Sequence, residues 1–560
     1  MAFGILEDNK LSHVPGTSLL EDEAQNPEES SAPPQSASHL KHATGRNSHI
    51  ILIPQPSDDP NDPLVLLSRI TLNWSLLRRD FMLAIFSFGF IVNVGVCGPI
   101  LAAGTLQVAA DFHVSITAIA TQTGYQLLAI GIVGPFVSAL SRIYGKRPQF
   151  ITASLFGVLG TVICCVAETY NTMLAGRVLQ GFGNVAYESI IISVIGDIYC
   201  LHERGLRVAV FNFVFGGVNC FTSVISGAIT RHLGWRWVFY IDIIFVALQA
   251  ILTILFTTET AYLRDAKYDI DVAGEEFFDY SEKIGAPQYV ENKGEASNAE
   301  NQRYIPPKKT YLQSIKPYHG RVSFENPLRL IVRPFAVLLN PAIIWIILAM
   351  SIPLAWIVNI LYCVAQLYGL SPYNLPADKI GYISFGPLVA GFIASLFFFM
   401  VNNPMTLWIS RKNNCIYEPE FKLPVGSLLG TFCLAIGCFG FGNAHRSHKS
   451  PVVAAVMFGF VCAGSTSMTI TASNYMIDAY RDLSVEIIIA AMSVKNLIFF
   501  GFSHFFNNWV ESAGPDVVFD ILGAIAVFTS LIITLPLYVY GKRIRSWWYR
   551  AQLLKRLKLA

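Results

Sequence analysis

The chain has 560 residues, of which 53% are hydrophobic and only 14% are charged, and its mean hydropathy is +0.47. A soluble domain carries about 25% charged residues, so this chain has too few to cover a globule of its size. Leaving the excess apolar surface in water would cost about 25 cal/mol per Å². The composition therefore argues against a soluble enzyme, a secreted disulfide scaffold and a nucleic-acid binder. The net charge of +2 indicates no class of partner.

The first segment, residues 1–75, is polar and rich in proline, serine and acidic residues. Such a composition cannot bury enough apolar surface to fold alone. We therefore expect a mostly disordered N-terminal arm. It carries no positively charged start followed by an apolar run and a cleavage site, so no secretory signal peptide is expected.

The rest of the chain is dominated by apolar stretches of about 20 residues, the length that crosses a bilayer as a helix. Barrel strands are shorter and alternate apolar with polar residues, whereas 88–104 is apolar on every face. The predicted fold class is therefore an all-α polytopic membrane protein with twelve transmembrane helices. The predicted spans are 82–106, 116–140, 149–168, 173–196, 208–230, 236–257, 337–362, 380–401, 424–443, 452–476, 486–507 and 516–540.

Charged stretches divide the spans into two sets of six. The predicted organisation is a bundle at 76–257, a charged linker at 258–336, a second bundle at 337–541 and a basic tail at 542–560. The tail interleaves Lys and Arg with aromatic residues, as in a segment that lies on an anionic leaflet.

Lysine and arginine are concentrated in every second loop, which by the positive-inside rule faces the cytosol. Three loops of the opposite set contain neither residue, at 109–113, 167–172 and 511–515. An even number of spans then places both termini in the cytosol. We expect a multi-pass protein of the plasma membrane, acting as a monomer surrounded by lipid. The basic loop residues are Arg142, Lys146, Arg147, Arg204, Arg207, Arg411, Lys412, Lys422 and Arg481.

The two halves contain short echoes of each other. Gly-Tyr at 124–125 and at 381–382 each precedes a glycine by ten residues, and Asp-x-Tyr ends both the fourth and the tenth span. Two parallel repeats with a site between them are typical of alternating-access transporters.

Several motifs carry a family resemblance over essentially all of 78–545. SRIYGKRP (141–148), GRVLQGFG (176–183) and GWRWVF (234–239) resemble signatures of the major facilitator superfamily. Further stretches at 187–205, 411–424 and 474–480 resemble its fungal drug/proton-antiporter-like branch, which includes polyamine and cation transporters. The resemblance implies two pseudo-symmetric six-helix bundles, a cavity lined by spans one, four, seven and ten, and proton coupling.

Two departures from the family pattern affect what can be carried over. The acidic residue of the loop signature corresponds to Arg142, so the usual clamp from this loop to span eleven cannot form in its standard way. The antiporter signature of span five reads Thr222–Ser223 and Ser226–Gly227 in place of Gly-Pro and Gly-Gly. Import and export therefore both stay open.

Glu188 is the leading candidate for proton coupling. It lies in an apolar stretch of span four, about three turns from Arg177. An ionised group at the bilayer centre costs from about 3 to more than 10 kcal/mol, so such groups are paired, hydrated or functional. The alternative is a structural carboxylate bonded to a neighbouring Asn or Ser. Arg177 matches the motif arginine that the family associates with proton coupling, or else is a buried arginine satisfied by carbonyls of span one.

The other membrane charges are expected to pair. Asp242 is predicted to pair with Arg231 or Arg236, and Lys495 to neutralise Glu188, Asp242 or Asp478 or to contact an anionic substrate. Asp197 and Asp478, at cytosolic helix ends, are predicted to pair with Lys or Arg. The candidate gate residues are Asp197, Arg142, Arg147 and Asp478.

Polar and aromatic residues of the expected cavity are candidates for substrate contact, although each alone could instead serve helix packing. The candidate substrate-binding residues are Glu188, Asn93, Gln126, Tyr187, Asn219, Trp356, Asn359, Tyr362, Asn474 and Lys495. Acids outnumber Lys495 among the inner candidates, which favours a cationic or amphipathic solute.

The predicted function is secondary active transport of a small organic solute, with protons as the coupling ion and no enzymatic activity. No phosphate-binding loop for ATP and no metal-ligand spacing is present, so no cofactor is expected, and no nucleic-acid partner. Efflux of a drug-like compound or secondary metabolite is an alternative. A non-transporting membrane sensor on the same fold is another, and a channel a third.

Overall fold

The computed structural model describes residues 4–6, 10, 14, 16–19, 76–199, 207, 220–261, 310–318, 320–413, 416–480 and 483–557. The first half of the membrane domain contains α1 (Leu76–Phe90) continued by η3 (Ile91–Val96), α2 (Thr105–Phe112), α3 (Ile116–Tyr144), α4 (Arg147–Cys165), α5 (Tyr170–Ser189), α6 (Ile191–Ile198), helical residues 220–233 and α8 (Arg236–Phe256). The second half contains α12 (Pro341–Gly369), α13 (Ala377–Tyr382), α14 (Phe385–Lys412), α15 (Leu423–Arg446), α16 (Pro451–Ala479), α17 (Ser484–Ser503), α18 (Phe506–Ala513), α19 (Pro515–Val527), η8 (Phe528–Ile532) and α20 (Thr534–Ala551).

Shorter elements occupy the ends and connections. They are β1 (Ser18–Leu19), α10 (Tyr311–Ser314), α11 (Pro327–Ala336), η5 (Val337–Leu339), β2 (Ile416–Tyr417), η6 (Pro419–Lys422) and α21 (Leu553–Arg556). The helix α20 runs across residue 541, where the sequence pattern places the start of the basic tail.

The prediction of twelve spans agrees with this architecture. Within the described residues, 11 helices are long and apolar enough to cross a membrane, and each overlaps a predicted span. The remaining predicted span, 208–230, is represented by the helical residues 220–233, because 208–219 lie outside the described part of the chain.

The helices begin where local chemistry satisfies their first free amides. Ser115 and Thr169 accept hydrogen bonds from Ala118 N and Thr172 N at the starts of α3 and α5. Asn340 caps α12 in the same way, and Pro341 follows it at the first helical position. Side-chain caps replace missing intrahelical partners, and proline lacks the amide that would otherwise be unpaired.

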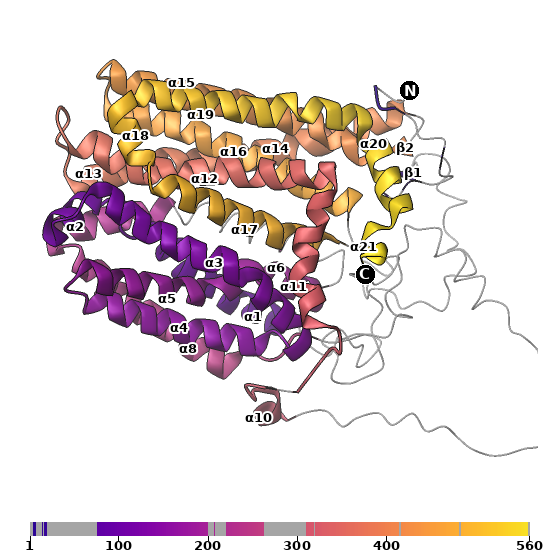
Figure 1. Cartoon of the computed structure of the whole chain (residues 1–560), viewed down its shortest axis with the longest axis horizontal. Helices are drawn as coiled ribbons and strands as arrows, with labels where there is room; N and C mark the ends of the chain where they lie inside the picture. The colour runs from indigo at the N-terminus through magenta and orange to yellow at the C-terminus, as the bar shows by residue number, and fades with distance from the viewer. Residues whose placement is uncertain are drawn as a thin grey trace, which may run out of the picture.

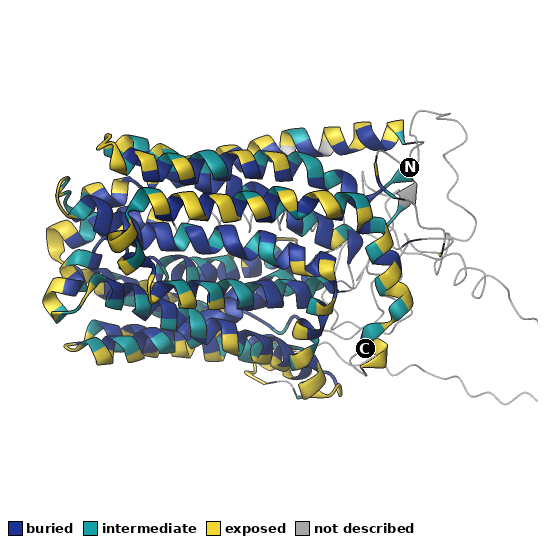
Figure 2. Cartoon of the chain, turned by 45° about the horizontal axis from the view of Figure 1, so that its top comes forward, coloured by how far each residue is buried: buried dark blue, intermediate teal, exposed yellow. Residues whose placement is uncertain are grey.

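The helices form two bundles that lie side by side (Figure 1). One contains the helices from α1 to α8, in indigo to magenta, and the other those from α12 to α20, in orange to yellow. In the part of the chain that the structure describes, the seam between them is formed mainly by α3 and α17, with further contacts between α2 and α12 and between α5 and α17. Buried residues line the faces where helices meet, and exposed ones lie on the outside (Figure 2).

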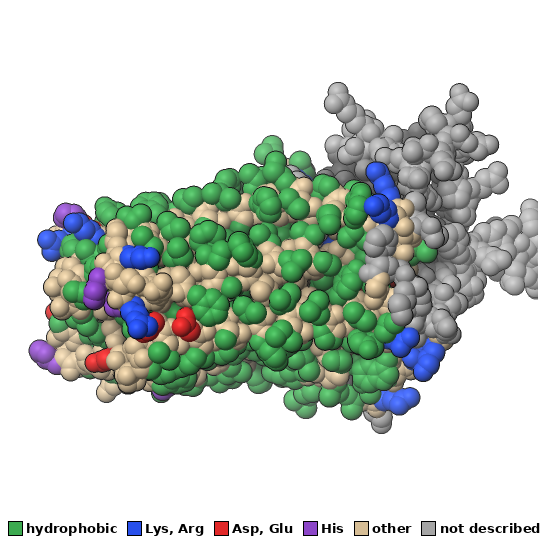
Figure 3. Space-filling model, turned by 90° about the horizontal axis from the view of Figure 1, so that it is seen from above, with side chains coloured by type: hydrophobic (Ala, Val, Ile, Leu, Met, Phe, Trp, Pro, Cys, Tyr) green, Lys and Arg blue, Asp and Glu red, His purple; other side chains and the backbone are tan. Residues whose placement is uncertain are grey.

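The outer surface is suited to lipid. Large apolar side chains such as Ile132, Phe156, Ile244 and Phe392 are exposed along the helices. Figure 3 shows hydrophobic side chains along the body of the molecule, with Lys and Arg gathered towards its two ends. A chain with this surface is stable only with a hydrocarbon belt around it.

Candidate substrate and coupling site between the bundles

The seam contains an ion pair between the two halves of the protein. Lys495 Nζ of α17 contacts Glu188 Oε1 of α5. The Glu188 side chain is 1% exposed and that of Lys495 is 16% exposed. This agrees with one of the predicted partners of Lys495, and it places the carboxylate inside the protein and not against lipid.

The span that holds this carboxylate, α5 with α6, is the most enclosed of the 11 spans that the structure describes. The apolar window of Tyr170–Ile198 is 72% buried. At Gly181 a β-carbon would lie 2.5 Å from the backbone oxygen of Gln126, so only glycine lets α5 approach α3 this closely. Small residues at such crossings are typical of helix packing in membranes.

Buried amides with unsatisfied polar atoms lie on the same three helices. Glu188 Oε2, Asn184 Oδ1 and the side-chain amides of Gln126 and Asn496 have no hydrogen-bond partner among the described residues. Asn184 lies four positions before Glu188 and therefore on the same face of α5. At Gly131 a β-carbon would lie 3.2 Å from Asn496 Cβ, which shows how closely α3 and α17 pack there.

An unsatisfied buried polar atom costs about 1–3 kcal/mol, and native proteins retain few without a reason. Water or a polar solute would satisfy these atoms. Asn184 is absent from the sequence-based candidates. The four-residue spacing to Glu188 is the signal that identifies it, because that spacing places both side chains on one helix face.

Arg177 is held within the first bundle. Its Nη1 donates to the carbonyl of Cys97 and, at 3.3 Å, to Gln180 Oε1. The guanidinium carbon lies 5.8 Å from the ring centre of Phe239. The Cys97 carbonyl belongs to the first span, so the contact expected of a structural arginine is present, and a role of Arg177 in proton coupling stays a prediction.

The predicted pairing of Asp242 with Arg231 or Arg236 is wrong. Asp242 Oδ2 accepts from Cys97 Sγ at 3.6 Å, whereas Arg236 Nη1 lies 3.4 Å from Asp111 Oδ2. Six positions on a helix rotate a side chain by about 240° relative to its starting direction. Asp242 therefore faces the bundle interior while Arg236 faces the polar loop.

Three of the other predicted substrate residues bond to neighbouring helices. Asn93 and Tyr187 both bond to Gln249, with Asn93 Nδ2 at 3.2 Å from Gln249 Oε1, inside the first bundle. Tyr362 crosses the seam, bonding to Thr123 Oγ1 at 2.6 Å and donating to the carbonyl of Gly98 at 2.8 Å.

The remaining members of that set have local contacts. The Trp356 ring packs against Phe502 with ring centres 5.2 Å apart. Asn359 Nδ2 donates to Ala355 O on its own helix at 2.9 Å. Asn474 is half-buried, and Asn219 lies outside the described residues.

Arg142, Asp197 and Asp478, three of the predicted gate residues, form ion pairs at one end of the bundles. Arg142 Nη2 lies 3.0 Å from Glu486 Oε1, and Arg333 Nε lies 3.2 Å from the same oxygen. Arg142 belongs to α3 and Glu486 to α17, so the pair joins the two bundles. A contact to span eleven is therefore present, with the base on span two and the acid on span eleven.

Two further pairs tie loops to helix ends within each half. Lys146 Nζ lies 2.6 Å from Asp197 Oδ2, and Lys422 Nζ lies 2.6 Å from Asp478 Oδ2. The predicted pairing of Asp197 and Asp478 with lysine or arginine is therefore confirmed. Burial lowers the pKa of Lys146, and the Asp197 carboxylate partly offsets this effect. Arg147 donates to the carbonyls of Ile254 and Ile315 at 2.9 and 2.6 Å.

A second acidic cluster lies at the same end of the second bundle. Arg545 Nη2 contacts Glu418 Oε2 and Glu420 Oε2, both at 2.8 Å, and Lys542 Nζ lies 2.7 Å from Glu418 Oε1. Burial opposes ionisation of Glu418, but Arg545 and Lys542 outweigh it and hold its pKa below the usual range. Two basic residues of the predicted tail are thus committed to internal ion pairs.

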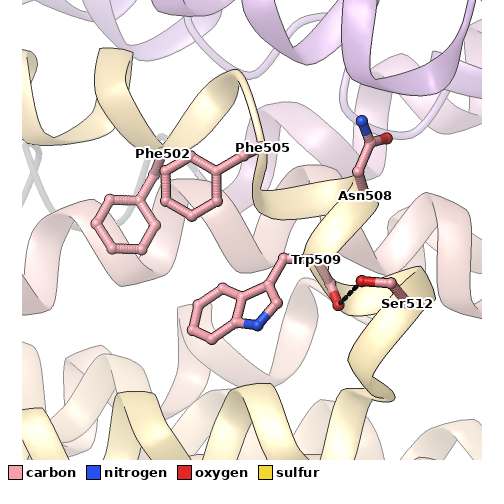
Figure 4. A pocket seen from close by; sticks show the side chains of 5 residues that line it. All are labelled: Phe502, Phe505, Asn508, Trp509 and Ser512. Carbon is pink, nitrogen blue, oxygen red and sulfur yellow. Dashed lines mark hydrogen bonds between the residues drawn. The ribbon is translucent and has the colours of Figure 1, made fainter.

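The opposite end of the seam is also joined. Thr117 Oγ1 donates to Asn508 Oδ1 at 2.6 Å, and Thr121 Oγ1 donates to Ser503 O at 3.1 Å. Beside this contact lies a cavity of about 560 Å³ lined by Phe502, Phe505, Asn508, Trp509 and Ser512. Figure 4 shows the three aromatic rings around a common space, with Asn508 pointing towards the helices of the first half.

The arrangement of two helical bundles around polar groups at their seam can be compared with known proteins. The sequence model described as Major Facilitator Superfamily matches residues 81–499. This chain belongs to the major facilitator superfamily. It is therefore a multi-pass membrane transporter and not an enzyme.

Fungal proteins are similar to the chain over nearly its whole length. An uncharacterized MFS-type transporter of Schizosaccharomyces pombe is 23% identical, over 96% of this chain and 94% of that protein. Protein HOL1 of Saccharomyces cerevisiae is 24% identical, over 90% of this chain and 92% of that protein.

The same fold is found in a solved transporter. The crystal structure of a D-xylose-proton symporter matches with a TM-score of 0.54 and 15% identity, over 80% of this chain and 96% of that one. At this identity the likeness establishes the fold alone.

Proposed function

We propose that this superfamily member is a secondary active transporter that couples the movement of a small cationic or amphipathic organic solute to protons by alternating access. Glu188 is the proposed proton carrier and the partner of the cation. The observation that carries the proposal is the buried Glu188–Lys495 pair across the seam. A carboxylate in that place can change both its own charge and the contact between the bundles.

The chemistry of the pair supplies a coupling mechanism. An ionised Glu188 attracts Lys495, and this attraction keeps the two bundles in contact at the pair. Protonation of Glu188, or arrival of a solute ammonium at its carboxylate, removes or replaces that attraction. Removing one partner of a buried ion pair costs about 3–5 kcal/mol, because the other charge is left without compensation. A proton or a solute cation bound to Glu188 therefore competes with Lys495 for the same carboxylate.

The groups around the pair fit a cation. Glu188 Oε2 and Asn184 Oδ1 are acceptors without a partner among the described residues, and an ammonium has only donors to offer. The aromatic cavity lined by Phe502, Phe505 and Trp509 at the far end of the seam could receive the same solute first, since ring faces attract cations.

Import of a polyamine-like cation and efflux of a drug-like compound or secondary metabolite use the same site. The sequence of span five, at Thr222–Ser223 and Ser226–Gly227, lacks the glycine–proline pattern of antiporters, which supports import. A non-transporting sensor is less well supported, because the Arg142–Glu486 pair joins the two bundles at the predicted inner gate.

The test is uptake into proteoliposomes with an imposed pH gradient, using labelled spermidine and tetraphenylphosphonium as probes and xylose as an uncharged control. Wild type should accumulate at least one cation, and the E188Q variant should lose gradient-driven accumulation while retaining solute exchange. The control variant E168Q changes an exposed loop carboxylate and should behave as wild type. Wild-type pH dependence in E188Q would remove Glu188 from the mechanism.

The direction and range of substrates are best read in cells. Measuring the growth and uptake of a deletion strain with a series of cationic solutes and toxins gives both the direction of transport and the range of substrates. Hypersensitivity to a toxin would indicate export, and loss of uptake would indicate import. The absence of any solute-dependent phenotype or flux would favour the sensor.

A further inference from the structure

The described residues of the N-terminal arm pack onto one end of the second bundle. Strand β1 pairs antiparallel with β2, with Ser18 opposite Tyr417 and Leu19 opposite Ile416. Ile5 is 0% exposed and packs with Ile409, Phe421 and Tyr538. We call the described residues of this segment, 4–6, 10, 14 and 16–19, the N-terminal strap.

The path of the strap depends on specific backbone contacts. Leu6 N donates to Val539 O at 3.0 Å. Gly16 has a positive φ of 91°, and a β-carbon there would lie 2.8 Å from Asp478 O and 3.0 Å from Arg545. Only glycine combines that backbone conformation with so close an approach, so residue 16 is fitted to this surface.

A side-chain contact joins the strap to the acidic cluster. Thr17 Oγ1 donates to Glu418 Oε2 at 2.8 Å, and Arg545 Nη2 contacts the same oxygen at 2.8 Å. The strap therefore touches α14, η6, α16 and α20, all in the second bundle, and its hydroxyl lies against an ionised carboxylate.

We infer that Thr17 is a modification site that controls docking of the strap, with phosphorylation releasing it from Glu418. A protein kinase would transfer the γ-phosphoryl group of ATP to Thr17 Oγ1. The new O–P bond replaces the β–γ bridging bond, ADP leaves, and the hydroxyl proton passes to the kinase base. The hydroxyl donor is then lost and about two negative charges lie against Glu418, an arrangement that disrupts by repulsion.

Sequence and position support the assignment. The acids Glu21, Asp22 and Glu23 follow the hydroxyl within six residues, a context that favours kinases selective for acidic segments. The Lys/Arg pattern places this end of the bundles in the cytosol, where kinases and ATP are found. Thr17 itself is half-buried, so the kinase would act on the open strap and keep it open.

Release would loosen the end of the second bundle. The docked strap bridges the ends of α14, α16 and α20, and the end of α16 carries Asp478, which pairs with Lys422. With the strap detached, these helix ends lose a shared contact. The docked strap therefore restrains movement of these helix ends at the predicted inner gate.

The test is hydrogen exchange of the full chain in lipid nanodiscs, followed by mass spectrometry of peptides covering 4–19 and 416–422. T17D should exchange faster in both, by about tenfold, the ratio expected when one hydrogen bond to a carboxylate is lost. T17V removes the donor without adding charge and should show a smaller change. Peptides from α3 and α12 serve as the control for global unfolding and should stay unchanged.

A variant that moves the carboxylate shows whether faster exchange in T17D comes from charge repulsion or only from the loss of the threonine side chain. In T17D/E418Q the carboxylate moves from position 418 to position 17, so Arg545 keeps an acidic partner and protection should return. Wild-type protein phosphorylated in vitro at Thr17 should match T17D, which covers the case that T17D does not fold. Wild-type protection in T17D, or equal loss in T17V and T17D, would overturn the proposal.

Discussion

Arg142 on α3 and Glu486 on α17 form an ion pair across the seam, with 3.0 Å between Nη2 and Oε1. Glu486 Oε1 is shared with Arg333 at 3.2 Å, so one buried carboxylate binds two arginines. Arg142 itself is 35% exposed. Glu486 is thus common to both ion pairs, and if one arginine is removed the other still contacts its carboxylate.

The first prediction concerns this shared carboxylate. E486Q should destabilise the protein and open the predicted inner gate more than R142Q or R333Q, because it removes two ion pairs and leaves two guanidinium groups without their acid. Coupling within one network is about 0.5–3 kcal/mol, and the exposure of Arg142 places its pair towards the lower end. Thermal unfolding in detergent, with a double-mutant cycle over 142 and 486, measures this. Equal losses in all three single variants would contradict the ranking.

The second prediction concerns Lys495. K495Q leaves Glu188 buried without its cation, which costs about 3–5 kcal/mol when the acid stays ionised. The double variant K495Q/E188Q removes both charges and should unfold at a higher temperature than K495Q alone. Thermal unfolding at neutral pH in detergent checks the order. A double variant less stable than K495Q would show that the pair does not govern stability at this site.

Much of this architecture could be predicted from sequence. Span length and the basic loops follow from the bilayer itself, and the charged linker at 258–336 marks the division into two halves. For Asp197 and Asp478 the type of partner, lysine or arginine, could be predicted, because these acids lie at helix ends next to basic loops. The contacts of Asp242 could not, because they depend on which face of α8 turns inward. The docking of Ile5 and Thr17 could not be predicted either. The polar composition is a property of the whole arm and does not show that a few of its residues pack against the second bundle.

The third prediction separates packing from solute binding. Both polar atoms of the Asn496 amide are buried and without a partner among the described residues. N496L should therefore keep or raise the unfolding temperature while raising KM for the transported solute. The control is N93L, because Asn93 Nδ2 donates to Gly89 O at 2.9 Å and to Gln249 at 3.2 Å, and losing such bonds costs about 1 kcal/mol each. Unchanged KM in N496L would exclude Asn496 from the solute path.

The last prediction uses a native thiol pair as a sensor of bundle movement. Cys220, in the helical residues 220–233, and Cys462 of α16 are buried neighbours on opposite halves of the protein. If the bundles separate there during the transport cycle, a disulfide between them should stop transport. Oxidation of wild type with copper–phenanthroline should therefore abolish flux in proteoliposomes, and dithiothreitol should restore it.

The matched control for this prediction is C220S, which should transport normally before and after oxidation because no bridge can form. Mass spectrometry of disulfide-linked peptides gives the fraction that is bridged, so flux can be compared with it directly. Full transport in a completely bridged sample would show that this part of the seam stays closed throughout the cycle. The movement would then have to occur at the other contacts between the bundles, Glu188–Lys495 and Arg142–Glu486 among them.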